Sequence, residues 1–183
     1  MFSSRLLNGL ILGCALLVAG CDRQSGEPAQ PQATSAAEAG TIDRSHKGSE
    51  MPDFTFADTA GKELQLKELK GKPVLLNLWA TWCAPCVAEL PALDRLVQSG
   101  AIRVVTISQD MGQPEKVAAF LKQRGVTRLE PWLDPKSDLA FHYGAAPLPI
   151  SVLYGSDGRE VWRMSGPLEW DEPEVRKLVA EAK

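Results

Sequence analysis

The feature that most constrains the fold of this chain is a nearly continuous apolar run, "KPVLLNLWA", followed at once by "TWCAPCVAEL". An apolar run of this length without polar alternation predicts a strand buried on both faces of a sheet. Residues 84–98 then carry apolar side chains at helical spacing, and Gly100 follows as a typical helix stop. Cys83 and Cys86 therefore lie where a buried strand gives way to a helix.

Two cysteines separated by two residues can bind zinc, form a structural disulfide or carry out redox chemistry. A zinc site needs four ligands, whereas this chain has no second such pair and only two histidines, His46 and His142. A disulfide closing so short a loop contributes little stability, because the gain grows with loop length. We expect no metal and no other cofactor.

The position of the pair favours the redox interpretation. Free backbone N–H groups at a helix N-terminus favour an anion, so a thiolate at Cys83 is stabilised and the pKa of its thiol is lowered. Pro85 suits the first helical turn, where its missing N–H is not needed. Cys86 lies one turn into the helix and is expected to be more buried. The predicted roles are attack by Cys83 and resolution of the resulting mixed disulfide by Cys86.

The rest of the chain predicts one α/β domain, residues 51–183. Its hydrophobic pattern and turn residues predict, in order, a hairpin (53–66), a strand (72–80), a helix (84–98), a strand (102–110), a helix (113–125), a loop or weak strand (126–135), a short helix (136–144), a hairpin (149–166) and a helix (171–183). This order indicates a mixed sheet flanked by helices, with the two central strands adjacent and parallel.

The N-terminus is typical of an exported protein. Residues 1–20 combine one positive charge with an apolar run that ends on small residues, as a signal peptide does. The stretch "LVAGC" resembles the bacterial lipobox, which implies that Cys21 is lipidated and becomes the new N-terminus. An ordinary signal peptide with an unrelated cysteine and an uncleaved anchor are the alternatives. Asp22 resembles an inner-membrane retention signal, so we expect a periplasmic protein held by lipid to the inner membrane.

Residues 21–50 are expected to form a lipidated, disordered tether, because beyond Cys21 they contain no aromatic residue and a single large aliphatic one. With Cys14 in the signal peptide and Cys21 lipidated, only Cys83 and Cys86 remain for the folded domain. Exported proteins meet an oxidising environment, where such a pair is expected to be bonded or cycling. The net charge of -3 and a pI near 5.5 argue against nucleic acid as a partner.

The segment "WATWCAPCVAELP" resembles the active-site segment of thioredoxin-fold proteins. More closely, it resembles the membrane-tethered TlpA/ResA-like (DsbE-like) thiol–disulfide oxidoreductases. The resemblance covers residues 51–183 and implies a thioredoxin-like fold, with a mixed central sheet flanked by helices and an additional N-terminal hairpin. It implies an enzyme that exchanges disulfides with other proteins.

A second part of the resemblance lies in "GAAPLPIS". Proteins of this fold carry a cis-proline before the third core strand, next to the cysteines, and Pro149 matches it better than Pro147. The resemblance implies that the backbone of Leu148 pairs with an extended substrate segment. Such pairing recognises the backbone of the substrate more than its side chains. Trp82, directly before Cys83, is assigned to the same substrate-binding surface.

One position departs from the soluble thioredoxins, which carry a buried aspartate six residues before the first cysteine. Asn77 stands there and cannot titrate, so a proton acceptor for Cys86 must come from elsewhere. Glu89 lies three residues after Cys86, on the same helical face, and matches a glutamate of ResA-like proteins. The hypothesis is that Glu89 takes up this proton, and the alternative is that it is an ordinary surface glutamate.

The residues between the cysteines bear on the direction of electron flow. Strong oxidants of this fold place a histidine there, whereas Ala84 and Pro85 offer no positive charge to a thiolate. We therefore expect a monomeric reductant of disulfides in exported proteins, supplied with electrons by a DsbD-like transmembrane reductase. Cytochrome c maturation is one role that the resemblance implies. A peroxide-reducing enzyme and a copper chaperone on the same fold are the competing functions.

Overall fold

The computed structural model describes residues 40–112 and 114–182. The predicted signal peptide, Cys21 and the first part of the predicted tether lie outside the described residues. The elements are β1 (Thr55–Ala57), β2 (Glu63–Gln65), the 3-10 helix η1 (Leu66–Leu69), β3 (Val74–Trp79), α1 (Ala84–Ser99), β4 (Arg103–Ser108), α2 (Pro114–Gln123), β5 (Trp132–Leu133), α3 (Asp138–His142), β6 (Ile150–Tyr154), β7 (Glu160–Ser165) and α4 (Pro173–Ala180).

The strands form one mixed sheet in the order β2-β1-β5-β4-β3-β6-β7. β3 and β4 are adjacent and parallel, as predicted, and β6 and β7 add antiparallel strands beside β3. The strand β3 is buried along its whole length, which explains its unbroken apolar sequence. The predicted thioredoxin-like arrangement, with an N-terminal hairpin and a mixed central sheet, is confirmed.

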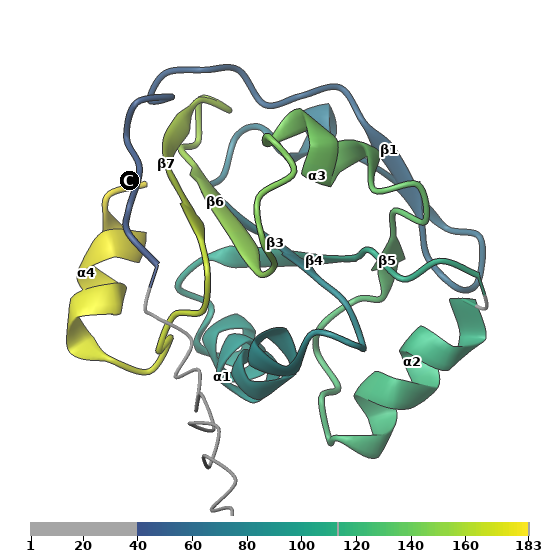
Figure 1. Ribbon diagram of the computed structural model, residues 1–183. Coiled ribbons are helices and arrows are strands. Elements are labelled where there is room, and N and C mark those ends of the chain that lie inside the picture. The colour runs from purple at the N-terminus through teal and green to yellow at the C-terminus, as the bar shows by residue number, and fades with distance from the viewer. Residues whose placement is uncertain (1–39, 113, 183) are drawn as a thin grey trace, which may run out of the picture. The chain divides into compact units, whose positions relative to one another are not determined.

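Helices lie on both sides of the sheet (Figure 1), and an apolar cluster lies against each of its faces. One cluster joins α1, α2 and α4 to the sheet, and its members include Leu75, Trp79, Leu90, Leu93, Val117, Leu121, Val175 and Val179. The other joins the N-terminal hairpin, η1 and α3 to the opposite face, and its members include Phe56, Leu66, Leu76, Leu78, Ile107 and Leu139. Because side chains alternate along β3, Asn77 points into the first cluster, beneath α1.

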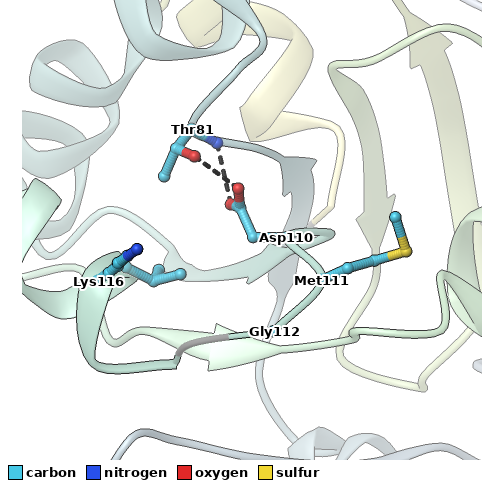
Figure 2. Close-up of a pocket in the computed structure, with 6 residues that line it drawn as sticks. Thr81, Asp110, Met111, Gly112 and Lys116 are labelled. Carbon is cyan, nitrogen blue, oxygen red and sulfur yellow. Dashed lines mark hydrogen bonds between the residues drawn. The ribbon is translucent and has the colours of Figure 1, made fainter.

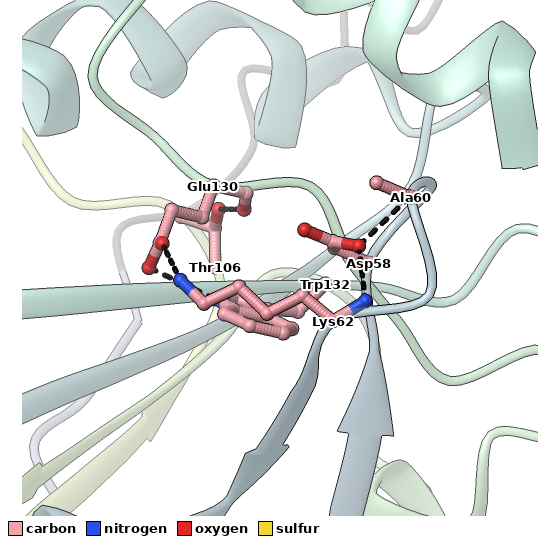
Figure 3. Close-up of polar contacts among 6 residues, drawn as sticks. All are labelled: Asp58, Ala60, Lys62, Thr106, Glu130 and Trp132. Atoms are coloured by element: carbon pink, nitrogen blue, oxygen red, sulfur yellow. Dashed lines mark hydrogen bonds and ion pairs between the residues drawn. The ribbon is translucent and has the colours of Figure 1, made fainter.

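The N-terminal hairpin is locked to the central sheet by polar contacts around Glu130 (Figure 3). Lys62 donates a hydrogen bond of 2.9 Å to the Glu130 carboxylate and lies over the ring of Trp132. The Trp132 indole donates to the other Glu130 oxygen at 3.3 Å, and Thr106 donates to the Glu130 carbonyl at 3.2 Å. These contacts explain why β1 can pair with the two-residue strand β5.

The predicted tether extends to Glu50, but the structure differs over its last part. Residues 40–50, called the strap below, run along β7 and hydrogen-bond to it through the backbone. Asp43 exchanges two backbone hydrogen bonds of 2.8 and 2.9 Å with Arg163. Because this pairing uses backbone groups, the polar composition of the strap gave no sign of it. The strap covers the edge strand of the sheet, which would otherwise be open to another chain.

No helix in residues 40–112 or 114–182 has the length and apolar character needed to cross a membrane.

Candidate active site

β3 and α1 bring the two cysteines to the end of the sheet, where they are joined by a disulfide with an S–S distance of 2.05 Å. Cys83 is the N-cap residue of α1, and its sulfur accepts a hydrogen bond of 3.3 Å from the backbone N–H of Cys86. The first turn of α1 contains no acidic residue. A negative charge on Cys83 would therefore meet the positive end of the helix dipole without a carboxylate in that turn. Cys86 is fully buried, whereas Cys83 is 6% exposed.

The loop between β3 and Cys83 is held by Asp110, which follows β4 (Figure 2). One carboxylate oxygen accepts hydrogen bonds from the Thr81 backbone N–H at 2.9 Å and the Ser108 hydroxyl at 2.7 Å. The other accepts from the Thr81 hydroxyl at 2.5 Å. Because Thr81 lies two residues before Cys83, these hydrogen bonds hold the backbone that leads into the disulfide in place.

Glu89 lies on the inner side of α1 and is only 6% exposed. The Asn77 amide donates a hydrogen bond of 2.7 Å to one of its carboxylate oxygens. The other oxygen accepts from the Trp170 indole at 3.1 Å and from the Leu168 backbone N–H at 3.3 Å. The carboxylate therefore connects β3 to the segment before α4, and an ordinary surface position for Glu89 does not fit the structure.

Burial raises the pKa of Glu89 from 4.5 to about 7, because water no longer solvates the carboxylate. The hydrogen bonds from Asn77, Leu168 and Trp170 oppose this effect, and the nearby charge of Glu169 adds to it. A carboxyl group with this pKa can both accept and release a proton near neutral pH. The Asn77 amide suits either state, since it can donate to a carboxylate or, if turned, accept from a carboxylic acid.

The peptide bond between Leu148 and Pro149 is cis, as the resemblance implied for Pro149. Leu148 and Trp82 line a shallow cavity of about 170 Å³, together with Phe141, Ala145 and other residues. Trp82 and Phe141 are exposed at 70% and 67%, so both large apolar side chains face solvent. Two of the predicted substrate-binding residues, Trp82 and Leu148, thus line one apolar surface, and Pro149 directly follows Leu148 in the chain.

The structure adds three residues that the sequence reasoning missed: Asp110, Phe141 and Trp170. None has a local signal, because each acts through a partner far along the chain, and the Trp170–Glu89 contact spans 81 residues. Within the part of the chain that the structure describes, no group of three or more His, Cys, Asp or Glu side chains is placed to hold a metal ion.

A family model described as Redoxin matches residues 46–179 of the chain. The thiol-disulfide oxidoreductase ResA of Bacillus anthracis is 34% identical over 122 residues, which cover 65% of this chain and 69% of that protein. ResA of Bacillus subtilis (strain 168) is 34% identical over 127 residues, covering 67% and 69%.

Solved structures show the same fold. An exposed lipoprotein thioredoxin of Streptococcus pneumoniae superposes with a TM-score of 0.62 and 26% identity, over 71% of this chain and 99% of that one. A secreted disulfide oxidoreductase of Mycobacterium tuberculosis superposes with a TM-score of 0.59 over 70% of this chain and 95% of that one. Its identity of 23% supports the fold alone.

Proposed function

The chain belongs to the redoxin family and is a thiol–disulfide oxidoreductase, and we propose that it works as a reductase of disulfide bonds in exported proteins. The observation that carries this proposal is the Cys83–Cys86 disulfide at the N-terminus of α1. It lies at an end of the sheet with a buried carboxyl group, Glu89, behind it.

The reaction begins with the reduced pair. The Cys83 thiolate attacks one sulfur of a substrate disulfide, forms a mixed disulfide and releases the other substrate sulfur as a thiolate. The buried Cys86 thiol then passes its proton to the Glu89 carboxylate and attacks the Cys83 sulfur. The second substrate sulfur leaves as a thiolate, and both thiolates take up protons. Two electrons move to the substrate, which becomes a dithiol, while Cys83 and Cys86 become the disulfide seen here.

The substrate surface is proposed to consist of Trp82, Leu148 and Pro149. An extended substrate segment would pair with the backbone of Leu148, while Trp82 offers an apolar surface beside Cys83. Such backbone pairing would let one enzyme accept several partner proteins.

The proposal also covers the direction of electron flow, the cellular location of the protein and its partner proteins. Ala84 and Pro85 leave a Cys83 thiolate without a cationic partner between the cysteines, which favours a reductant. We propose that the protein is exported and held by lipid on Cys21 to the inner membrane, facing the periplasm. A DsbD-like transmembrane reductase would return electrons to the disulfide, and proteins of cytochrome c maturation are among the candidate substrates.

A trapping experiment tests this function. Replacing the resolving residue, Cys86→Ala, should leave Cys83 joined to its substrates, and mass spectrometry of the adducts would identify them. The matched variant Cys83→Ala, which keeps the buried cysteine alone, should trap none. The wild-type protein should reduce insulin disulfides. Faster turnover of peroxide, or tight copper binding by the reduced protein, would reject the reductase in favour of the corresponding alternative.

A further inference from the structure

Cys86 has no direct contact with water, since its exposed fraction is zero. The proton that leaves its thiol must therefore pass through a neighbouring group. Glu89 occupies the same face of α1 one turn later, and its own carboxylate is nearly as well enclosed. The position of the Glu89 carboxylate relative to water therefore decides whether it can complete the transfer.

Glu89 lines a cavity of about 360 Å³ between α1 and residues 167–171. Pro85 and Ala92 line the helix side of this cavity, and Leu168 lies opposite. At the rim, Arg95 and Asp171 form an ion pair whose side chains are more than half exposed. The cavity thus reaches the protein surface on the side of α1 where the Arg95–Asp171 pair lies.

The two oxygens of the Glu89 carboxylate face in different directions. One accepts the Asn77 amide from inside the sheet, and the other accepts the Trp170 indole and the Leu168 N–H from the segment beside the cavity. Trp170 is itself 2% exposed, so its N–H has little access to water and is committed to this bond.

We propose that Trp170 is a positioning residue for proton transfer, whose indole N–H holds the Glu89 carboxylate at the wall of the cavity between α1 and residues 167–171. This position keeps Glu89 on the face of α1 that carries Cys86 and opens its carboxylate to water through the cavity. The proton of Cys86 then leaves through this cavity. The inference rests on the proposed function of Glu89 as the acceptor.

The groups around the Glu89 carboxylate shift its pKa in opposite directions. Glu169 raises the pKa of Glu89, as burial does, whereas the Trp170 hydrogen bond lowers it by favouring the charged form. Arg95 and Asp171, the other charged residues that line the cavity, are paired with each other. Among the residues that line this cavity, Glu89 is the buried group whose pKa is raised to about 7.

The experiment uses Trp170→Phe in the full chain, since phenylalanine keeps most of the volume and lacks the N–H. The reduced protein is mixed with limiting dithionitrobenzoate, and stopped-flow absorbance follows the second thionitrobenzoate release, which reports the attack by Cys86. Loss of one hydrogen bond to the carboxylate should raise the pH midpoint of this second phase by about one unit. The control is Trp162→Phe, which removes an indole bond to the Leu178 carbonyl and should leave the midpoint unchanged.

A second variant tests the cavity without touching the hydrogen bond. Ala92→Leu should displace water from the cavity, desolvate Glu89 and raise the same midpoint, whereas Gln98→Leu, on the exposed surface of α1 outside the cavity, should not. The comparison of Ala92→Leu with its control tests the role of the cavity even if Trp170→Phe does not fold.

The possible failures are distinguishable. If Glu89→Gln leaves the second phase unchanged, Glu89 is not the proton acceptor and the proposed function loses that step. If Glu89→Gln alters the profile while both Trp170→Phe and Ala92→Leu leave the midpoint in place, the acceptor stands. In that case the positioning role of Trp170 and the cavity is refuted.

Discussion

Replacing Glu89 with glutamine should change how the stability of the oxidised protein depends on pH. Glutamine has nearly the same shape, and its oxygen can accept the hydrogen bonds from Trp170 and Leu168. Its amide N–H can donate to the Asn77 side-chain oxygen, which has no hydrogen-bond partner among the described residues. The substitution therefore removes a titrating group while keeping the packing.

The magnitude follows from the pKa of Glu89, which burial raises from 4.5 to about 7. Well below pH 4.5 the carboxyl group is protonated in the folded and unfolded states alike, so its titration does not change stability with pH there. Between the two pKa values the unfolded chain binds fewer protons than the folded one, and stability falls as pH rises. The free energy of unfolding should drop by about 2–3 kcal/mol between pH 5 and pH 8 on account of this group alone.

The assay is urea unfolding of the oxidised wild type and of Glu89→Gln at pH 5 and at pH 8. Because other carboxylates titrate equally in both proteins, the difference between them isolates Glu89. The variant should gain about 2–3 kcal/mol relative to wild type as pH rises from 5 to 8. Glu63→Gln, at an exposed strand position, serves as the control and should gain nothing. A difference between wild type and Glu89→Gln that stays constant with pH would refute the raised pKa.

Three further predictions concern other parts of the molecule. Asp94→Ala leaves the backbone N–H groups of residues 127–129, of which that of Leu129 is buried, without their common acceptor, and chemical unfolding should show a loss of about 1–3 kcal/mol. Gly40→Ala would place a methyl group against the β7 backbone, so hydrogen exchange should become faster in the strap while α1 keeps its protection. Replacing Trp82 or Phe141 with serine should raise KM for a peptide disulfide several-fold with little change in kcat, because both side chains line the apolar surface beside the disulfide; an unchanged KM would remove them from substrate binding.

The strand–cysteine–helix junction could be read directly from the sequence because its signals are local. An unbroken apolar run, helical spacing after Cys83 and a stop at Gly100 each depend on neighbours within a few residues. The structure places Cys83 at the N-cap and ends α1 with Gly100 in the left-handed conformation, which glycine adopts most easily. The parallel pairing of β3 and β4 was likewise predictable, since a helix must carry the chain from one to the other.

The position of the strap could not be predicted from local sequence signals. Its composition indicated a disordered tether, yet residues 40–50 pair with β7 through backbone atoms that every residue possesses. Pairing of this kind depends on the edge that the rest of the sheet leaves open, and no short stretch of sequence records it.

The sequence by itself determined that Cys83 and Cys86 lie at the start of a helix that follows a buried strand, because those features follow from short-range spacing. It also marked Glu89 as lying on the same helical face as Cys86. Only the tertiary structure decided that Glu89 is buried, because its burial requires Trp170 and Leu168 to fold back against α1 from the segment before α4. The acidity of a carboxyl group depends on what surrounds it in space, and here those surroundings come from distant parts of the chain.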